Sequence, residues 1–188
     1  MFDISNFHTA LSTHWPIWLL SAVLIVAAVI DGWKRKVPNW LTFPLVLTGW
    51  AYSSYYFGWE GLGYSLLGTA VGLGLLLPLY AIGGMGAGDV KLLAGVGAWV
   101  WAAATFYSFC VSAIVGGAIA VGLVLWQRDW NFQLNRLATV VGEILEMRNP
   151  NKLAAAAEQR KGSATLLPYG IPIAIGSIAY FFWSGMLL

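Results

Sequence analysis

The uncharged stretch LLAGVGAWVWAAATFYSFCVSAIVGGAIAVGLVLWQ, from Leu92 to Gln127, decides the class of fold. It has 36 residues and contains neither a charge nor a proline. A single helix of this length would measure about 54 Å, whereas the apolar core of a bilayer is about 30 Å thick. We therefore predict that the stretch crosses a membrane twice. The turn is expected within Trp99–Tyr107, where aromatic side chains suit the membrane interface.

The rest of the chain has the same apolar character. Of its 188 residues, 59% are hydrophobic and 10% are charged, and the mean hydropathy is +0.72. A soluble domain carries about 25% charged residues. We therefore predict an all-α, polytopic membrane protein that forms a single transmembrane domain over residues 1–188. A span needs about 20 apolar residues, and the six candidates are Trp15–Ile30, Trp40–Phe57, Gly61–Ile82, Leu92–Ala104, Tyr107–Trp126 and Leu166–Met186.

The basic residues indicate the orientation of these spans. All ten lie in three of the connecting segments: Lys34, Arg35 and Lys36; Lys91; and Arg128, Arg136, Arg148, Lys152, Arg160 and Lys161. Six spans with the N-terminus outside place all three segments on one face of the membrane. The positive-inside rule identifies that face as cytoplasmic.

The longest polar segment, Gln127–Ala164, falls on this cytoplasmic face. Apolar residues recur within it at helical spacing, namely Phe132, Leu137, Val140, Val141, Ile144 and Leu145. The pattern predicts an amphipathic helix on the membrane surface, followed by a second short helix over Lys152–Arg160. The segment either only connects two spans or also takes part in substrate access.

The cysteine and histidine content argues against disulfide and metal chemistry. Cys110 is the only cysteine and lies within a predicted span, so disulfide frameworks and cysteine-rich zinc sites are excluded. His8 and His14 make at most a weak metal site. We expect no metal, no other cofactor and no nucleic-acid partner.

Two carboxylates, Asp31 and Asp89, stand apart from the other acidic residues, which lie in termini or loops. Asp31 directly follows the apolar run of the first span, and Asp89 precedes the uncharged stretch quoted above. The predicted topology brings both to the same membrane face at a similar depth. Two carboxylates that lie close together cannot both ionise. The charged one can then take a proton from an attacking water while the other donates to an amide carbonyl.

The segment GGMGAGDVK, Gly83–Lys91, surrounds Asp89 with glycines. Gly84, Gly86 and Gly88 permit unusual backbone angles and a close approach to an extended peptide. Irregular backbone at this depth is tolerated beside a water-filled cavity. The same pattern also fits a tight turn after which Asp89 caps the next helix. Glycines within the spans are expected to pack helices together, for example Gly68, Gly72 and Gly74.

Three segments together resemble the type IV prepilin peptidase family. GGMGAGDVKLLAGVGAW resembles the family's Gly-x-Gly-Asp motif, with Gly86-Ala87-Gly88-Asp89 as its core. DGWKRKVPNWLT, Asp31–Thr42, is similar to the segment that carries the family's other catalytic Asp. PYGIPIAIG, Pro168–Gly176, is similar to the opening of the family's last span. The three segments occur in the family's order and extend from the first span to the last.

The resemblance implies an intramembrane aspartic endopeptidase of a bacterial or archaeal cytoplasmic membrane, with its active site facing the cytoplasm. It would remove the short basic leader of prepilin-like precursors, in which about 20 apolar residues follow the leader. Asp31 and Asp89 would be the catalytic pair. The resemblance also implies a substrate-binding surround made of Gly84, Gly86, Gly88, Lys91, Pro38 and Asn39.

Larger family members add an N-terminal domain with two Cys-x-x-Cys pairs and N-methyltransferase activity. Only fourteen residues precede the first predicted span here, and Cys110 is alone. We therefore expect no methyltransferase domain. The compact form resembles the peptidases of tight-adherence (Flp) pili and the archaeal preflagellin peptidases.

Two other classes of function remain open from the residues alone. A proton- or ion-coupled transporter would use Asp31 and Asp89 as ion sites, since intramembrane carboxylates mark such pathways. A non-catalytic scaffold of a pilus machine would use them as interface charges. A transporter usually places its carboxylates near the membrane midplane, whereas these two are predicted to lie toward one face. That placement favours the peptidase.

Overall fold

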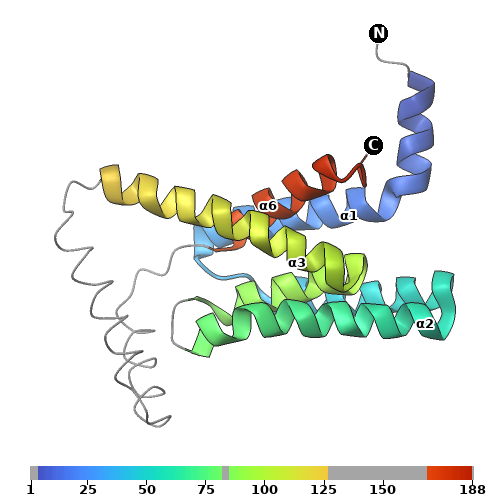
Figure 1. The fold of residues 1–188 in the computed structure, drawn as a ribbon, viewed down its shortest axis with the longest axis horizontal. Helices are drawn as coiled ribbons and strands as arrows, with labels where there is room; N and C mark the ends of the chain where they lie inside the picture. Colours follow the sequence, from blue (N-terminus) through green and yellow to red (C-terminus); the bar gives the residue numbers. More distant parts are fainter. Residues whose placement is uncertain (1–3, 82–84, 127–168, 188) are drawn as a thin grey trace.

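The structure, a computed structural model, describes residues 4–81, 85–126 and 169–187. These residues form α1 (Ile4–Lys34), α2 (Asn39–Ala81), α3 (Ala87–Trp126) and α6 (Gly170–Trp183), as Figure 1 shows. Three helices in the described part of the chain are long and apolar enough to cross a membrane, over His14–Lys34, Asn39–Ala81 and Ala87–Gly122, and α6 is a shorter apolar helix. The prediction of an all-α membrane protein is therefore confirmed. The predicted amphipathic segment Gln127–Ala164 lies outside the described residues.

Helix α2 is interrupted at Gly58, where the chain turns back on itself. Gly58 has a φ of 65° and a ψ of −152°, a conformation that glycine adopts readily and other residues do not. The indole N–H of Trp50 donates to Oγ1 of Thr69 at 3.0 Å. In one continuous helix these two residues would lie about 28 Å apart along the axis. The two halves of α2 therefore pack side by side (Figure 1), and the break falls between the predicted spans Trp40–Phe57 and Gly61–Ile82.

Helix α3 is interrupted at Trp101, within the range Trp99–Tyr107 that the sequence predicts for a turn. Trp101 has a φ of 64° and a ψ of −175°. A positive φ is unfavourable for a bulky residue and persists only where its surroundings hold it. The Trp101 ring packs edge-on against Phe57 with 5.3 Å between ring centroids, and its indole N–H lies 3.4 Å from Oγ of Ser53. Contacts with α2 thus hold the turn of α3.

Small residues let α2 and α3 pack closely. The backbones of Gly68 and Gly97 are in direct contact, and a Cβ atom at Gly72 would lie 2.5 Å from the carbonyl oxygen of Leu93. Close packing of this kind is typical of transmembrane helices, which gain little from apolar burial in lipid. The prediction of a packing role is confirmed for Gly68 and Gly72. It is wrong for Gly74, because a Cβ atom there would meet nothing within 4 Å.

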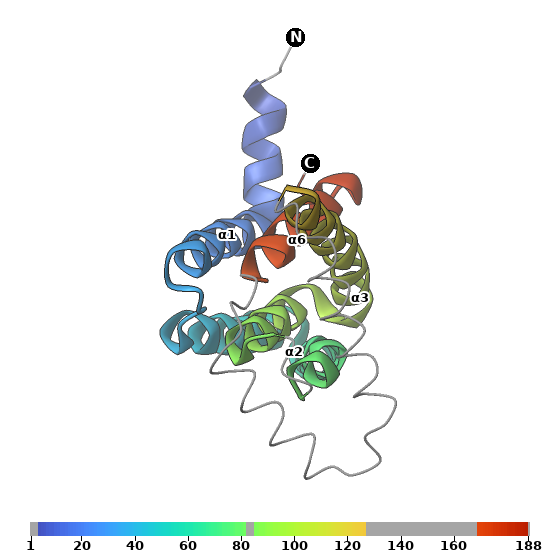
Figure 2. The same ribbon diagram turned by 90° about the vertical axis from the view of Figure 1, so that its left-hand side faces the viewer.

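Helix α6 lies between α1 and α3, which Figure 2 shows from the end of the molecule. Against α3, the ring of Tyr180 stacks on Tyr107 with 5.8 Å between centroids, and Ser112 lies next to the backbone of Gly176. The first residue of α6, Gly170, lies beside Asp31 near the C-terminal end of α1. The packing of α6 therefore positions its N-terminal end at the two predicted catalytic segments.

The close contact between α2 and α3 predicts a difference between two glycine variants. Gly68→Ala should destabilise the protein by about 1–3 kcal/mol, because the added methyl group meets the backbone of Gly97. Gly74→Ala should be neutral or stabilising by up to about 1 kcal/mol, because alanine is the better helix former and this position is open. Thermal unfolding in detergent measures both. Equal melting temperatures for the two variants would contradict this packing.

Candidate active site

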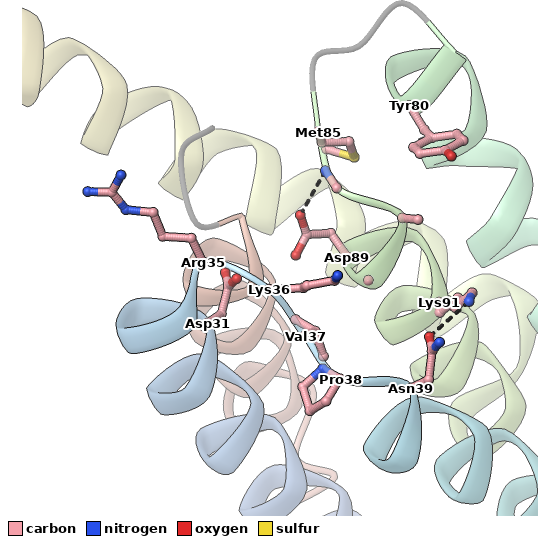
Figure 3. A pocket seen from close by; sticks show the side chains of 13 residues that line it. Asp31, Arg35, Lys36, Val37, Pro38, Asn39, Tyr80, Met85, Asp89 and Lys91 are labelled. Atoms are coloured by element: carbon pink, nitrogen blue, oxygen red, sulfur yellow. Dashed lines mark hydrogen bonds between the residues drawn. The ribbon is translucent and has the colours of Figure 1, made fainter. Parts of the chain in front are cut away.

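The structure brings Asp31 and Asp89 together, although they are 58 positions apart in the sequence. Asp31 lies in the last turn of α1, and Asp89 lies in the first turn of α3. Both side chains are buried, with 2% and 5% of their surface exposed. They point toward one another in Figure 3, and they are close enough to interact electrostatically. The predicted spatial pairing of the two carboxylates is therefore present in the fold.

A backbone N–H from α6 binds the carboxylate of Asp31. The N–H of Gly170 donates to Oδ2 of Asp31 at 2.8 Å, and the same N–H interacts with the carboxylate of Asp89. A Cβ atom at position 170 would lie 2.8 Å from Oδ2 of Asp31, so only glycine allows this approach. Hydrogen bonds of this kind offset part of the free-energy cost of burying a carboxylate.

Gly170 is a site residue that the sequence analysis did not identify. The segment PYGIPIAIG, which contains it, was noted as a similarity to the opening of the last span. Its glycine follows Tyr169, whose ring lies against Gly116 of α3. The Pro-Tyr-Gly sequence directly before an apolar helix was the available signal.

Asp89 also closes the turn that begins α3. The N–H of Gly86 donates to Oδ2 of Asp89 at 3.3 Å, and the N–H of Asp89 donates to the carbonyl oxygen of Gly86 at 3.2 Å. The first bond is one half of a capping box, in which the side chain of the third helical residue accepts the N–H of the residue before the helix, and the second is a backbone bond of the turn. The carboxylate therefore caps α3 and also faces Asp31. The two interpretations that the sequence left open are compatible.

The glycines before Asp89 act through close approach and not through unusual backbone angles. Neither Gly86 nor Gly88 has a positive φ, so the expectation of such angles is wrong at both positions. A Cβ atom at Gly88, however, would lie 2.7 Å from the carbonyl oxygen of Val37, in the segment between α1 and α2. Gly88 thus lets the start of α3 lie against the segment that follows Asp31. Gly84 lies outside the described residues.

The pair of carboxylates opens onto a cavity of about 500 Å³ (Figure 3). Its lining includes every described member of the predicted substrate-binding surround, namely Pro38, Asn39, Gly86, Gly88 and Lys91. Lys91 donates from Nζ to Oδ1 of Asn39 at 2.9 Å and lies over the ring of Phe43 at 4.9 Å from its centroid. Lys91 therefore connects the start of α3 to the start of α2 at the wall of the cavity.

The chemistry available in this cavity is acid–base chemistry by carboxylates. The cavity volume lies in the range of ligand sites, about 300–1,000 Å³. Arg35 and Lys36 also line the cavity, and together with Lys91 they give its wall positive charge. Among the described residues, no group of three or more His, Cys, Asp and Glu side chains is placed to hold a metal ion. Two facing carboxylates beside a polar cavity suit the hydrolysis of an amide.

Comparisons with known proteins identify one matching family and several curated relatives. A family model described as the type IV leader peptidase family matches residues 18–121, a range that contains both Asp31 and Asp89. The curated relatives include proteins named prepilin leader peptidase/N-methyltransferase. The one from Aeromonas hydrophila is 35% identical over 114 residues, which cover 57% of this chain and 39% of the relative. The one from Neisseria gonorrhoeae is 30% identical over 138 residues, which cover 70% of this chain and 48% of the relative.

The matches cover only part of these relatives. A third, from Burkholderia pseudomallei, is 32% identical over 122 residues, which cover 61% of this chain and 38% of the relative. The chain thus spans less than half the length of the curated relatives that it matches. No solved structure matches it.

The contact between Gly88 and Val37 predicts unequal effects of two neighbouring glycine variants. Gly88→Ala should lower the free energy of unfolding by about 1–3 kcal/mol, because the methyl group would displace the segment after Asp31. Gly86→Ala should have a smaller effect, because its Cβ atom would come no closer than 3.3 Å to a neighbour, Oδ2 of Asp89. Thermal unfolding in detergent again provides the comparison. A larger loss for Gly86→Ala than for Gly88→Ala would contradict the observed approach.

Proposed function

Because the chain belongs to the type IV leader peptidase family, we propose that it is an intramembrane aspartic endopeptidase that removes the leader from prepilin-like precursors. The observation that carries this proposal is the buried, facing pair Asp31 and Asp89 on the wall of a polar cavity. Relatives named prepilin leader peptidase/N-methyltransferase support the substrate class. Of the two activities in the names of these relatives, we propose only the peptidase for this chain. Flp-type precursors are the substrates that the resemblance in sequence favours.

The pair would act by general acid–base catalysis. One carboxylate is charged and takes a proton from water as the water oxygen bonds to the carbonyl carbon of the scissile amide. The other carboxyl group is protonated and donates a hydrogen bond to the carbonyl oxygen, where negative charge develops. As the carbon–nitrogen bond breaks, a proton passes to the departing amine. The products are a carboxylate on the leader and a free amine on the mature protein.

The cavity explains how a peptide could reach the pair. A helical peptide hides its carbonyl oxygens in its own hydrogen bonds, so the residues at the scissile bond must be extended. Unpaired backbone groups are unfavourable in lipid and acceptable only where protein or water pairs them. Lys36 and Asn39 line the cavity on the side of α2, and the backbone of Gly86 and Gly88 lines it on the side of α3. Polar groups of this kind provide partners for an extended substrate backbone.

We further propose that the chain forms one domain with six spans, with the N-terminus outside. The breaks at Gly58 and Trp101 support this count, because both parts of α2 and the second part of α3 have about the length of a span, and the first part of α3 is a shorter helix. Lys34, Arg35 and Lys36 lie three to five residues after Asp31, so the positive-inside rule favours a cytoplasmic position for the cavity. Segment 127–164 would lie on the same face.

The dyad predicts that each Asp→Asn variant is inactive. Asp31→Asn and Asp89→Asn should each lower the rate of leader cleavage by at least about 10³-fold, as for other catalytic groups that act as a unit. Both variants should fold, because the carboxamide oxygen still accepts the N–H of Gly170 or Gly86. The measurement is leader loss from a co-expressed prepilin, with the exposed Glu60→Gln as the control. Cleavage at the normal rate by either Asp variant would refute the mechanism, and ion transport by a protein that cleaves nothing would favour the transporter.

The topology predicts which residues an impermeant thiol reagent reaches in intact cells. In a Cys110→Ser background, a cysteine at Trp59 should react from outside, because Trp59 is 88% exposed beside the break at Gly58. A cysteine at Lys34 should react only after the membrane is opened. Labelling of both positions from outside would refute the six-span arrangement.

A further inference from the structure

A second hollow of the molecule is an apolar groove between α1 and α6, with a volume of about 590 Å³. Apolar side chains of both helices line it, namely Ile25, Ala28, Val29, Ile171, Ala174, Ile175, Ile178 and Ala179. The two helices run side by side in Figures 1 and 2, with α6 packed between α1 and α3. In the described part of the chain, all the side chains that line the groove are apolar. Its chemistry therefore differs from that of the catalytic cavity.

The shape of the groove suits a helix. Its floor contains small residues, since Ala174 is only 3% exposed and Ala28 is half-buried. Its rim is formed by branched side chains, of which Ile25, Val29 and Ile175 are each about half exposed. From Ile171 to Ala179 the groove follows α6 for about 12 Å, or two helical turns. Small residues between larger ones let a second helix approach closely within a membrane.

The groove and the proposed catalytic cavity share no lining residue, but one end of the groove lies close to the two carboxylates on both helices. On α1, Ala28 lines the groove and lies three residues before Asp31, so the two residues are neighbours on one face of the helix. On α6, Ile171 directly follows Gly170, whose N–H binds the carboxylate of Asp31. A Cβ atom at Gly32 would also lie 3.6 Å from Cδ1 of Ile171, so the ends of the two helices meet there. If a substrate's peptide bond were held at the two carboxylates, the substrate residues next to that bond would lie at the end of the groove.

We propose that this groove binds the apolar helix of the substrate that directly follows the scissile bond. The inference rests on the proposed peptidase function. A substrate segment that stays in lipid must be helical and apolar, since its backbone groups need internal partners. The charged side chains Arg35, Lys36 and Lys91 line the catalytic cavity, so the apolar segment is better accommodated by the groove. A basic leader gains no attraction from these cations, and much of the affinity for the precursor then comes from the apolar segment.

Site-specific cross-linking tests this placement. A photo-cross-linking phenylalanine analogue is introduced at Val29 or Ile175, on the rim of the groove, in the inactive Asp89→Asn protein. The control position is Val26, which is also on α1 and is 45% exposed against 50% for Val29, but does not line the groove. The probe is a full-length precursor with a basic leader and about 20 following apolar residues. Adducts with the precursor are expected from Val29 and Ile175, with a yield at least about tenfold above that from Val26, equivalent to about 1.4 kcal/mol of preference.

A kinetic comparison tests the same placement in active protein. Ala28→Leu fills the floor of the groove, and Ala22→Leu makes the same change at an exposed position of α1 outside it. Ala28→Leu should raise KM for the membrane-inserted precursor about tenfold with little change in kcat, which marks lost binding and not lost chemistry. Ala22→Leu should leave both constants within about twofold.

The outcomes separate this inference from the proposed function. Precursor cleavage by the unaltered protein, together with equal cross-linking at Val26 and Val29, would overturn the groove alone. Adducts at Val29 that contain only lipid or a second copy of the chain would do the same. A fall in kcat for Ala28→Leu without a change in KM would also overturn it. If the unaltered protein cleaves no precursor, the proposed function fails, and the inference fails with it.

Discussion

Two carboxylates, Asp31 and Asp89, are buried among apolar helices, and each must keep a hydrogen-bond donor. This constraint determines how the helices around them are arranged. Removing a charged carboxylate from water is unfavourable by several kcal/mol unless donors replace the water. Here the donors are backbone N–H groups of glycines, Gly170 for Asp31 and Gly86 for Asp89. Arg35 and Lys36 line the same cavity, but both side chains are exposed. The positions of α1, α3 and α6 follow from bringing these backbone groups to the carboxylates.

Glycine is required at such positions because a backbone N–H must come close to a side chain or to another backbone. A Cβ atom at residue 170 would meet the carboxylate of Asp31, and one at residue 88 would meet the carbonyl oxygen of Val37. The first glycine brings α6 to α1, and the second brings α3 to the segment after α1. Because α6 lies beyond the range 18–121 that the family model matches, the matched range does not contain every group that holds the carboxylate pair.

These features were predictable from the sequence to different degrees. The pairing of Asp31 and Asp89 was predictable because hydropathy and basic residues set the depth of each along its span. The turn near Trp101 was predictable because a bilayer limits the length of an uncharged helix. The role of Gly170 was not predictable, since it depends on a contact between residues 139 positions apart. The role of Gly74 was wrongly predicted for a related reason, because sequence does not specify which face of a helix meets its neighbour.

For the proposed peptidase, the positions of the cavity and the groove limit where a substrate could be cleaved. A substrate backbone can be extended only where polar groups pair it, and in the described structure those groups surround Asp31 and Asp89. In the groove, which begins at Ile171 and Val29, an extended backbone would leave its N–H and carbonyl groups without partners. A substrate bound as proposed would therefore change from extended to helical within a few residues of the carboxylates. Bonds deep within an apolar helix would remain helical and uncut, whereas a bond just before the helix could be opened. The boundary between the polar lining of the cavity and the apolar lining of the groove would then select the scissile bond. The selection would depend on the distance of that bond from the start of the substrate helix, and it would not require recognition of the leader by its charge.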